Sequence, residues 1–509
     1  MRLPRFFKKK CFAPGHSEEV ITVFPPGTPH KIFDFSFYHS DDWDPLNYGR
    51  DIDPDRPFWE QLSSFFFEIP HMPLEKDPLA VNSDYTLGGK GGRDNYYSGM
   101  AFGTEGAYYC LDARFSKDVF DCNLVTSCEL CYQSVGSSGC SNCSFVDDCE
   151  NCINSSFLFD CKNCSDCFFS FNLRNKSYVF GNEQLTKEGY EKKIGEIDLG
   201  NRETLNDYWG KFRDFTAGAV RRNLHNVNAV NSLGEGLTDC KSCHLVFRAS
   251  GSENSRYCDL VVSAKDCMDM LNTASGERNY ESVVTLGREN RFCLFARNVN
   301  DSEYCVECKN CESCFGCVGL RDKKFHIFNK PYGEDEYWRM VDDIKSKMLQ
   351  RGEYGEFFPL ELGLMPYQNS FAQRFFVLDP RSAAETGTPW YDEPEPRVPR
   401  EEVMRAANLP VHIKDVSDKI LEKTVECEAT GKFFRFSKNE LDFYRRRGLP
   451  LPDKHPWARM QERTTRERGI VLYEFTCPNC GESSYSSYDP GAQKKYKIFC
   501  EKCYLQAVV

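Results

Sequence analysis

Small and apolar side chains recur at every third residue between positions 110 and 167, and the residues between them are mostly polar or aromatic. An amphipathic helix repeats near 3.6 residues and a half-buried strand at 2, so neither accounts for this period. A narrow solenoid whose chain turns every few residues can direct each third side chain inward. We therefore predict a mainly β protein with slim β-solenoids. The cysteines in this phase are Cys110, Cys122, Cys128, Cys131, Cys140, Cys143, Cys149, Cys152, Cys161, Cys164 and Cys167.

The residues that replace cysteine in this phase favour a packed core over a metal site. Valine stands there at Val119 and serine at Ser134. A zinc ligand cannot be exchanged for valine, whereas free cysteine packs as a small hydrophobe. The CxxC pairs at 128/131 and 140/143 also have four-cysteine zinc spacing, so metal or disulfides stay as the alternative. The stretch resembles small cysteine-rich insect antifreeze solenoids, but it lacks their threonine rows and we do not expect ice binding.

Three expectations follow from this phase. The cysteine spacing is compatible with coils of roughly 12 to 18 residues. Aromatic residues outside the phase need cover from other segments or from a partner, because large exposed apolar patches are rare. A serine hydroxyl without a hydrogen-bond partner in this core would destabilise the fold. Cys152→Ser should then lower the free energy of unfolding by roughly 1 to 3 kcal/mol, more than Cys152→Ala does. The aromatic residues concerned are Phe120, Phe145, Phe157, Phe159 and Phe168.

A second cysteine-rich stretch repeats the end of the first one. Cys161-Lys-Asn-Cys164 returns as Cys308-Lys-Asn-Cys311 after 147 residues, and eleven identities in thirty residues indicate a duplication. The later identities align Leu173, Arg174, Lys176, Asn182 and Tyr190 with Leu320, Arg321, Lys323, Asn329 and Tyr337. Cysteines 240 to 267 share one phase and cysteines 293 to 317 another, so we predict a turn insertion near 270–290. Thr186 suits a helix start after the first solenoid. We expect each solenoid to end in a capping helix.

These features divide the chain into five predicted parts. Residues 353–409 are rich in proline, glutamate and aromatics, which predicts an extended connecting segment, and a helix is expected over 438–447. The predicted parts are 1–80, a degenerate zinc-ribbon-like module with an aromatic strap; 81–200, the first solenoid with its capping helix; 201–352, the second; 353–409, the connecting segment; and 410–509, a zinc-ribbon domain.

The carboxyl-terminal part carries the spacing of a zinc ribbon. Cys477-x2-Cys480 precedes Cys500-x2-Cys503 by nineteen residues, and two such pairs bring four thiolates to one tetrahedral ion. No position is left open for a substrate. We therefore predict one structural zinc ion held by Cys477, Cys480, Cys500 and Cys503.

Two other segments resemble this ribbon without its ligands. Cys11-x2-Pro14-Gly15 aligns with Cys477-x2-Cys480-Gly481, and Asp34 and Phe37 stand where the second cysteine pair would be. His16 could join Cys11, but two ligands rarely hold zinc, so we expect a metal-free module. A third partial knuckle, Cys427-x2-Thr430-Gly431 with His455 downstream, has the same defect.

Charge offers one candidate for nucleic-acid binding. The whole chain is acidic, with a formal net charge of -12, yet residues 435–468 hold ten Lys/Arg against five Asp/Glu. A basic patch beside a zinc ribbon suits RNA or DNA, whereas a solvated or acid-paired face is the alternative. The candidate contacts are Arg445, Arg446, Arg447, Arg459 and Arg463.

The sequence offers no pattern typical of catalysis, export or membrane insertion. It has no Ser/His/Asp order, no HExxH and no dinucleotide glycines, and its nine histidines are scattered. The basic start lacks an apolar run, so it is not a signal peptide, and no later segment predicts a membrane span. With 27 cysteines and no export signal, we expect a cytoplasmic protein with reduced thiols.

Several passages together resemble a family of uncharacterised bacterial proteins with cysteine-rich repeats and zinc-ribbon-like ends. Members are sometimes labelled CoA-transferases of the carnitine dehydratase type, but no residues here support an α/β acyl-transfer fold. The resemblance therefore implies the architecture and no activity. The passages are SDDWDPLNYGRD at 40–51, FGCVGLR at 315–321, FHIFNKPY at 325–332 and GEFFP at 355–359.

We predict a non-enzymatic scaffold or interaction protein with an unidentified protein partner. The first alternative is a nucleic-acid- or ribosome-associated factor that uses the arginine-rich domain. The second is a carbohydrate-acting enzyme on a β-helix, which would need two acids that converge on one solenoid face.

Overall fold

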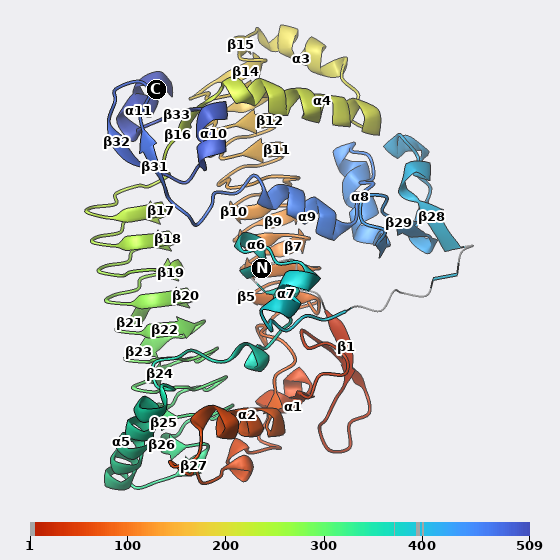
Figure 1. Ribbon diagram of the computed structural model, residues 1–509. Helices are drawn as coiled ribbons and strands as arrows, with labels where there is room; N and C mark the ends of the chain where they lie inside the picture. The colour runs from red at the N-terminus through yellow and green to blue at the C-terminus, as the bar shows by residue number, and fades with distance from the viewer. Residues whose placement is uncertain (1–5, 371, 393–397, 400–401, 509) are drawn as a thin grey trace.

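The computed structural model describes residues 6–370, 372–392, 398–399 and 402–508. More of these residues lie in strands than in helices, and most strand pairs are parallel. Figure 1 shows two stacks of short strands that lie side by side and run in opposite directions, with the amino- and carboxyl-terminal segments packed against them. The described part of the chain therefore combines many short, largely parallel strands with a smaller share of helix.

The first stack is a parallel ladder in which each residue pairs with the residue twelve positions later. Val81 pairs with Arg93, Arg93 with Glu105, and the series continues in equal steps to Ser177. Three further ladders begin three residues apart, so twelve residues make one coil. The strands are β5 (Thr86–Lys90), β6 (Ser98–Phe102), β7 (Glu105–Tyr108), β8 (Leu111–Arg114), β9 (Lys117–Phe120), β10 (Asn123–Thr126), β11 (Ser144–Asp147), β12 (Ser156–Phe159), β13 (Ser165–Phe171) and β14 (Ser177–Phe180), with β15 (Glu183–Gln184) antiparallel at the end.

The second stack is built in the same way, with two shorter coils. Val230 pairs with Lys241 and Glu277 with Arg288, both at eleven residues, and the other steps of this ladder are twelve. The predicted insertion near 270–290 is wrong: the phase slips because one residue is missing. The strands are β17 (Leu233–Thr238), β18 (His244–Ser250), β19 (Asp259–Val262), β20 (Met268–Ala274), β21 (Gly276–Glu277), β22 (Tyr280–Val283), β23 (Gly287–Arg288), β24 (Val299–Asn300), β25 (Glu312–Phe315), β26 (Lys324–Ile327) and β27 (Lys330–Pro331).

Each side of a coil uses three residues in fixed roles. Glu150 pairs in the ladder, Asn151 turns the corner in the left-handed region with φ of 51°, and Cys152 is fully buried. Asparagine, aspartate and glycine tolerate this conformation best, which explains their frequency at the corners. The Asn151 amide also donates to Asn163 Oδ1 at 3.2 Å, one coil later. The three-residue period is thus the period of the corners.

The inward cysteines form the core of each stack and are all free thiols. The Cys152 thiol donates to the carbonyl oxygens of Glu150 at 3.5 Å and Cys161 at 3.4 Å. Ser137 donates in the same way to Val135 and Val146, at 3.2 Å each. Both side chains are small and both satisfy carbonyls that face the interior, so cysteine and serine are interchangeable here.

The aromatic residues outside the cysteine phase are buried, as predicted, by other segments of the chain. Phe145 stacks on Phe157 with ring centroids 4.8 Å apart, and Trp209 of α4 (Arg202–Phe215) lies 5.2 Å from Phe145. Phe120 stacks at 3.8 Å on Phe443 of α8 (Lys438–Arg447). The predicted helix over 438–447 is therefore present, and it covers one side of the first stack.

A helix follows the last coil of each stack. α3 (Lys187–Gly195) follows β15, and α5 (Glu334–Arg351) follows β27. Tyr190 and Tyr337 occupy corresponding places in these helices and are both buried. In Figure 1, α3 lies at the end of the first stack and α5 at the end of the second.

The amino-terminal segment packs against the last coils of the second stack. Glu307 accepts hydrogen bonds from Tyr38 Oη at 3.0 Å and faces His71 Nδ1 at 3.2 Å, with all three side chains buried. Phe58 and Phe66 of its longest helix join the same core. Its elements are β1 (Phe7–Lys10), β2 (Glu19–Thr22), β3 (Lys31–Ile32), α1 (Phe35–His39), α2 (Phe58–Glu68) and β4 (Pro70–His71).

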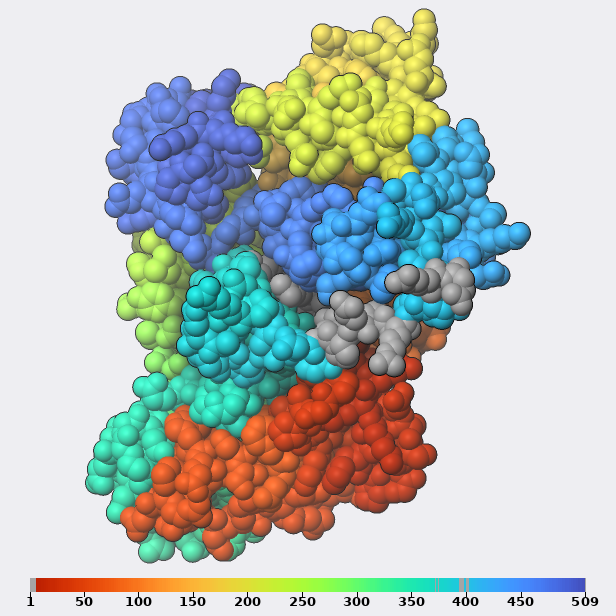
Figure 2. Space-filling model, turned by 45° about the vertical axis from the view of Figure 1, so that its right-hand side comes forward, coloured from red at the N-terminus to blue at the C-terminus, as the bar shows by residue number. Residues whose placement is uncertain are grey.

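The segment after α5 is not uniformly extended. It contains short helices before it reaches the carboxyl-terminal elements, and Figure 2 shows both regions over one face of the molecule. The elements are α6 (Ala372–Phe375), α7 (Pro380–Glu385), β28 (Val403–Arg405), β29 (Thr424–Glu426), β30 (Phe433–Phe434), α9 (Pro456–Thr464), β31 (Tyr473–Thr476), β32 (Ser483–Ser486), α10 (Pro490–Lys495), β33 (Lys497–Phe499) and α11 (Glu501–Val508); β33 pairs in parallel with β16 (Val220–Arg222).

The carbonyl contacts of the core reverse the expected order of two substitutions. Cys152→Ser keeps a donor for the Glu150 and Cys161 carbonyls, whereas Cys152→Ala removes it and leaves a small cavity. We expect alanine to destabilise the protein by about 1 to 3 kcal/mol and serine by less. The check is the urea midpoint of each variant, and a serine variant less stable than the alanine variant would contradict this role of the thiols.

Candidate metal centre

The first half of the carboxyl-terminal centre is a tight turn between β31 and β32. Cys477 directly follows β31, its amide donates to Glu482 O at 2.8 Å, and Gly481 N donates back to Cys477 O at 2.9 Å. Gly481 adopts φ of 75°, which favours glycine at this position. This turn places the thiols of Cys477 and Cys480 on the same side of the hairpin.

The second half brings two more thiols to the same point. Cys500 follows β33, and Cys503 lies in the first turn of α11. The four sulfur atoms all lie within 4.8 Å of one another, and Cys480 Sγ is 3.6 Å from Cys500 Sγ. Sulfurs at about 2.3 Å from a tetrahedral ion are roughly 3.8 Å apart. The four cysteines predicted as ligands therefore have a spacing that could bind a metal ion.

Backbone amides favour the charged form of one of these thiols. Burial opposes ionisation of Cys477, but the amides of Cys500, Asn479 and Cys480 outweigh it and lower its pKa to about 6. The amide of Cys500 lies 3.4 Å from Cys477 Sγ. Burial raises the pKa of Cys500 to about 12. A bound cation would favour the thiolate form of all four residues.

The two degenerate knuckles differ from each other. Cys427 lies in the same type of turn as Cys477, but within the described ranges the side chains around it form no group of three potential ligands. In the amino-terminal module, ligand atoms of Cys11, His16, Glu18 and Asp34 all lie within 4.8 Å of one another. The sequence pointed to Cys11 and His16. Asp34 stands at a cysteine position of the ribbon but was taken as a lost ligand because it is not a cysteine, and Glu18 was missed because it stands at no ligand position.

Three of the five candidate arginines lie in the last turn of α8, and each contacts another residue of the protein. Arg445 pairs with Asp418 at 2.6 Å and Arg446 with Asp118 at 3.4 Å. Arg447 donates to Ser144 Oγ at 2.9 Å, and burial lowers the pKa of its guanidinium. Of the three, Arg445 and Arg446 remain exposed.

The other two arginines are a correction. Arg459 is 3 % exposed and Arg463 is 0 % exposed, and both form ion pairs with the buried Asp121. Arg463 also donates to Asn123 Oδ1 at 3.1 Å and to the Tyr109 carbonyl at 2.8 Å. Side chains enclosed in this way cannot contact nucleic acid, so their assignment to RNA or DNA binding is wrong. They attach α9 to the first stack.

The chain after α9 extends this attachment to the second stack. Arg466 pairs with Asp147 at 2.8 Å, and Arg468 with Asp148 at 2.6 Å. Arg468 also lies 3.6 Å from Glu235 in β17. Arg468 thus contacts one acidic residue of each stack. Several of the basic residues in 435–468 therefore form ion pairs within the protein.

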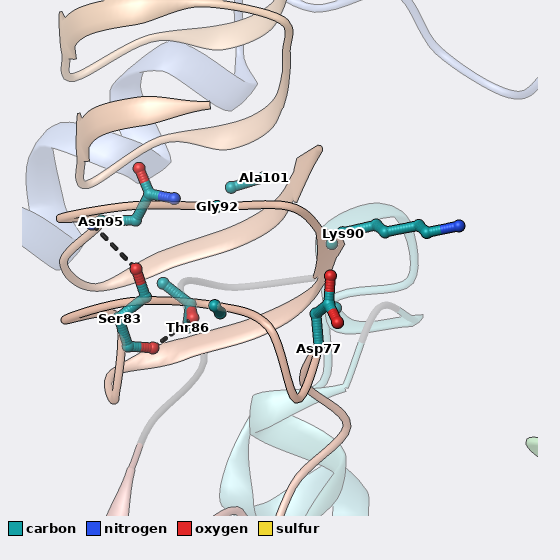
Figure 3. A pocket seen from close by; sticks show the side chains of 10 residues that line it. Asp77, Ser83, Thr86, Lys90, Gly92, Asn95 and Ala101 are labelled. Carbon is teal, nitrogen blue, oxygen red and sulfur yellow. Dashed lines mark hydrogen bonds between the residues drawn. The ribbon is translucent and has the colours of Figure 1, made fainter. Parts of the chain in front are cut away.

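Two cavities beside the first stack are small or open. Figure 3 shows one where the first stack begins, lined by Asp77, Ser83 and Asn95, with Lys90 directed away from it. Its volume of about 10 Å³ holds at most one water molecule. A groove of about 240 Å³ beside α8 is lined by Asp94, Glu105, Asp118, Asp442 and Arg446, among others. Its acidic lining does not suit a phosphate backbone.

Comparison with known proteins leaves the chain without an assigned family. No family model matches it, and no curated protein matches it. Among solved structures, it is similar to a crystal structure from Desulfovibrio desulfuricans G20 whose protein is proposed to be an acetyltransferase. The match has 10% identity, covers 57% of this chain and 80% of that chain, and has a TM-score of 0.11, which is too low to carry an argument about fold or activity.

The buried pairing of Asp121 generates a stability prediction. Asp121→Asn leaves two buried guanidinium groups without their carboxylate, and breaking such a buried pair costs about 3 to 5 kcal/mol. Asp118→Asn removes only the contact with the exposed Arg446 and should cost less than about 1 kcal/mol. Thermal unfolding of both variants provides the measurement. Equal melting temperatures would show that Asp121 does not hold α9 in place.

Proposed function

We propose that this protein is a non-enzymatic scaffold in which two β-solenoids present their exposed sides to a protein partner. Four parallel ladders spaced three residues apart, with a register of twelve residues, support the solenoid interpretation. The matching order of β14, β15 and α3 with β26, β27 and α5 supports a duplication. Coils of this kind are rigid and offer regularly spaced side chains.

The observation that carries the proposal is that buried charged side chains attach the terminal segments to the stacks and join the two stacks. Arg463 and Asp121 join α9 to the first stack, Arg468 reaches both stacks, and Glu307 holds the amino-terminal segment. These groups are placed for assembly of the fold rather than around a cavity that could enclose a substrate. A carbohydrate-acting enzyme stays an untested alternative.

We propose zinc as the ion of the carboxyl-terminal centre, with a structural role. Four thiolates at tetrahedral spacing are typical of structural zinc, because no ligand position stays open for a substrate. The amide of Cys500 donates to Cys477 Sγ, which orients the ligand and stabilises its charge. The centre would then hold β33, and through it the strand pairing with β16, beside the first stack.

We also propose a cytoplasmic location. Free thiols packed in both stacks suit a reducing compartment. Across the described part of the chain, none of the helices combines the length and apolar character needed for a membrane span.

Loss of the carboxyl-terminal ion should unfold the ribbon. Structural zinc contributes on the order of 10 kcal/mol to small domains, so Cys477→Ser should release one ion and expose residues 473–508 to hydrogen exchange. Ser483→Ala, at an exposed position of β32, is the matched control and should change neither. Unchanged exchange in the Cys477→Ser variant would show that the ribbon folds without metal.

Site-specific cross-linking tests the scaffold. A photoreactive side chain at Ile153 or Val230, both exposed ladder residues, should cross-link in cells to one discrete partner, while the same group at Leu505 on α11 should not. Reversal of the charge at Lys241, the rung next to Val230, or at Glu129, two rungs from Ile153 in the same ladder, should abolish the product. No product from either ladder position, or the same product from all three positions, would contradict a partner site on the stacks.

A further inference from the structure

The amino-terminal module repeats the backbone of the carboxyl-terminal ribbon. A hairpin of β1 and β2 is followed by β3 and α1. In the same order, β31 and β32 are followed by β33 and α11, with the short helix α10 inserted before β33. Gly15 adopts φ of 79° in the hairpin turn, and Gly481 adopts 75°. The two modules therefore share the turn that positions the first ligand pair of a ribbon.

Hydrogen bonds identify which residues correspond. Cys11 N donates to Glu18 O at 3.0 Å, as Cys477 N donates to Glu482 O. Asp34 N lies 3.2 Å from Cys11 Sγ, as Cys500 N lies 3.4 Å from Cys477 Sγ. Cys11 thus takes the place of Cys477, and Asp34 with its carboxylate takes the place of Cys500.

The other two ligand places are filled from a longer loop. Pro14 and Phe37 stand where Cys480 and Cys503 would be, and neither can bind a metal. One residue separates Gly481 from β32, whereas three separate Gly15 from β2, and these include His16 and Glu18. The extra residues direct an imidazole and a second carboxylate toward Cys11 and Asp34.

The resulting distances are those of a ligand cluster. His16 Nδ1 lies 3.0 Å from Asp34 Oδ2 and 2.8 Å from Glu18 Oε1, and Cys11 Sγ lies 3.7 Å from Asp34 Oδ2. One ring nitrogen carries at most one hydrogen, so it cannot donate fully to both carboxylates. A cation among these atoms would satisfy the nitrogen, both carboxylates and the thiolate at once.

We propose that Cys11, His16, Glu18 and Asp34 form a second metal site, which takes a divalent first-row transition ion such as zinc. Sulfur, imidazole nitrogen and carboxylate oxygen are the ligands that zinc uses in proteins. The Phe37 ring packs edge-on against the His16 ring at 5.1 Å and restricts its orientation. This proposal replaces the expectation of a metal-free module.

The partial exposure of the cluster determines how readily a bound ion is released. Cys11 is 4 % exposed, but the side chains of His16 and Glu18 are 32 % and 53 % exposed. An ion held there can exchange Glu18 for water or for an incoming ligand. This ion should therefore leave before the one held by four thiolates.

The Cys427 knuckle provides an internal contrast. Cys427 N donates to Lys432 O at 3.0 Å and Gly431 adopts φ of 65°, so the turn itself is the same. Its surroundings nevertheless gather no ligand group within the residues that the structure describes. The turn alone does not assemble a cluster, and the convergence of His16, Glu18 and Asp34 on Cys11 is particular to the amino-terminal module.

Cobalt loading of the full-length protein tests this site. After removal of metal and reloading with Co²⁺, we expect two ions per chain by elemental analysis. One should show the intense sulfur-to-cobalt charge transfer of four thiolates, and the other a much weaker charge-transfer band because only one of its ligands is a thiolate. A chelator titration should remove the second ion first.

Variants assign the second ion to the cluster. His16→Gln and Asp34→Asn should each bind one ion and keep the four-thiolate spectrum, which also reports that the variant is folded. Cys477→Ser should keep only the ion with the weaker charge-transfer band. Glu19→Gln, exposed and next to the cluster, should keep both ions. A single ion in the unchanged protein, or two ions in both His16→Gln and Asp34→Asn, would overturn the proposal.

Discussion

The interior of each stack is so narrow that it is filled by thiols, hydroxyls and aliphatic side chains without aromatic rings. A coil of twelve residues with four corners leaves three residues for each side, and one of them points inward. Cys152 and Ser137 meet this demand because each donates to carbonyls of its own and of the next coil. Leucine and valine also fit, but phenylalanine does not, so the large apolar residues lie outside.

That exclusion determines how the rest of the chain is arranged. The rings of Phe120 and Phe145 would be exposed on a bare stack, and α8 and α4 cover them. The adjoining helix α9 is held by charge, through the corner residue Asp121 of the first stack and Arg463 of α9. A buried ion pair contributes little net stability compared with an apolar contact, but it defines one docking position along a repetitive surface.

The sequence predicted those features whose residues lie close together along the chain. The phase of the cysteines identified the inward positions, and the two CxxC pairs identified Cys477, Cys480, Cys500 and Cys503 as a group. Coil length could not be predicted, because residues one coil apart are recognised only by their pairing. Arg463 looks like a surface residue in sequence, since its partner Asp121 lies far away in the chain. Asp34 was missed because its role depends on its position relative to Cys11, not on its type.

The attachment of the stacks at both ends has a consequence for how such a protein can change length. Eight successive pairs run from Val81 to Ser177 in the first stack, and eight run from Val230 to Lys324 in the second. The amino-terminal segment holds Glu307 near one end, and Arg468 joins the stacks near the other. An insertion of one coil in a single stack would move one anchor by about 4.8 Å relative to its partner. Coils can therefore be added to or removed from such a protein only in equal numbers in both stacks.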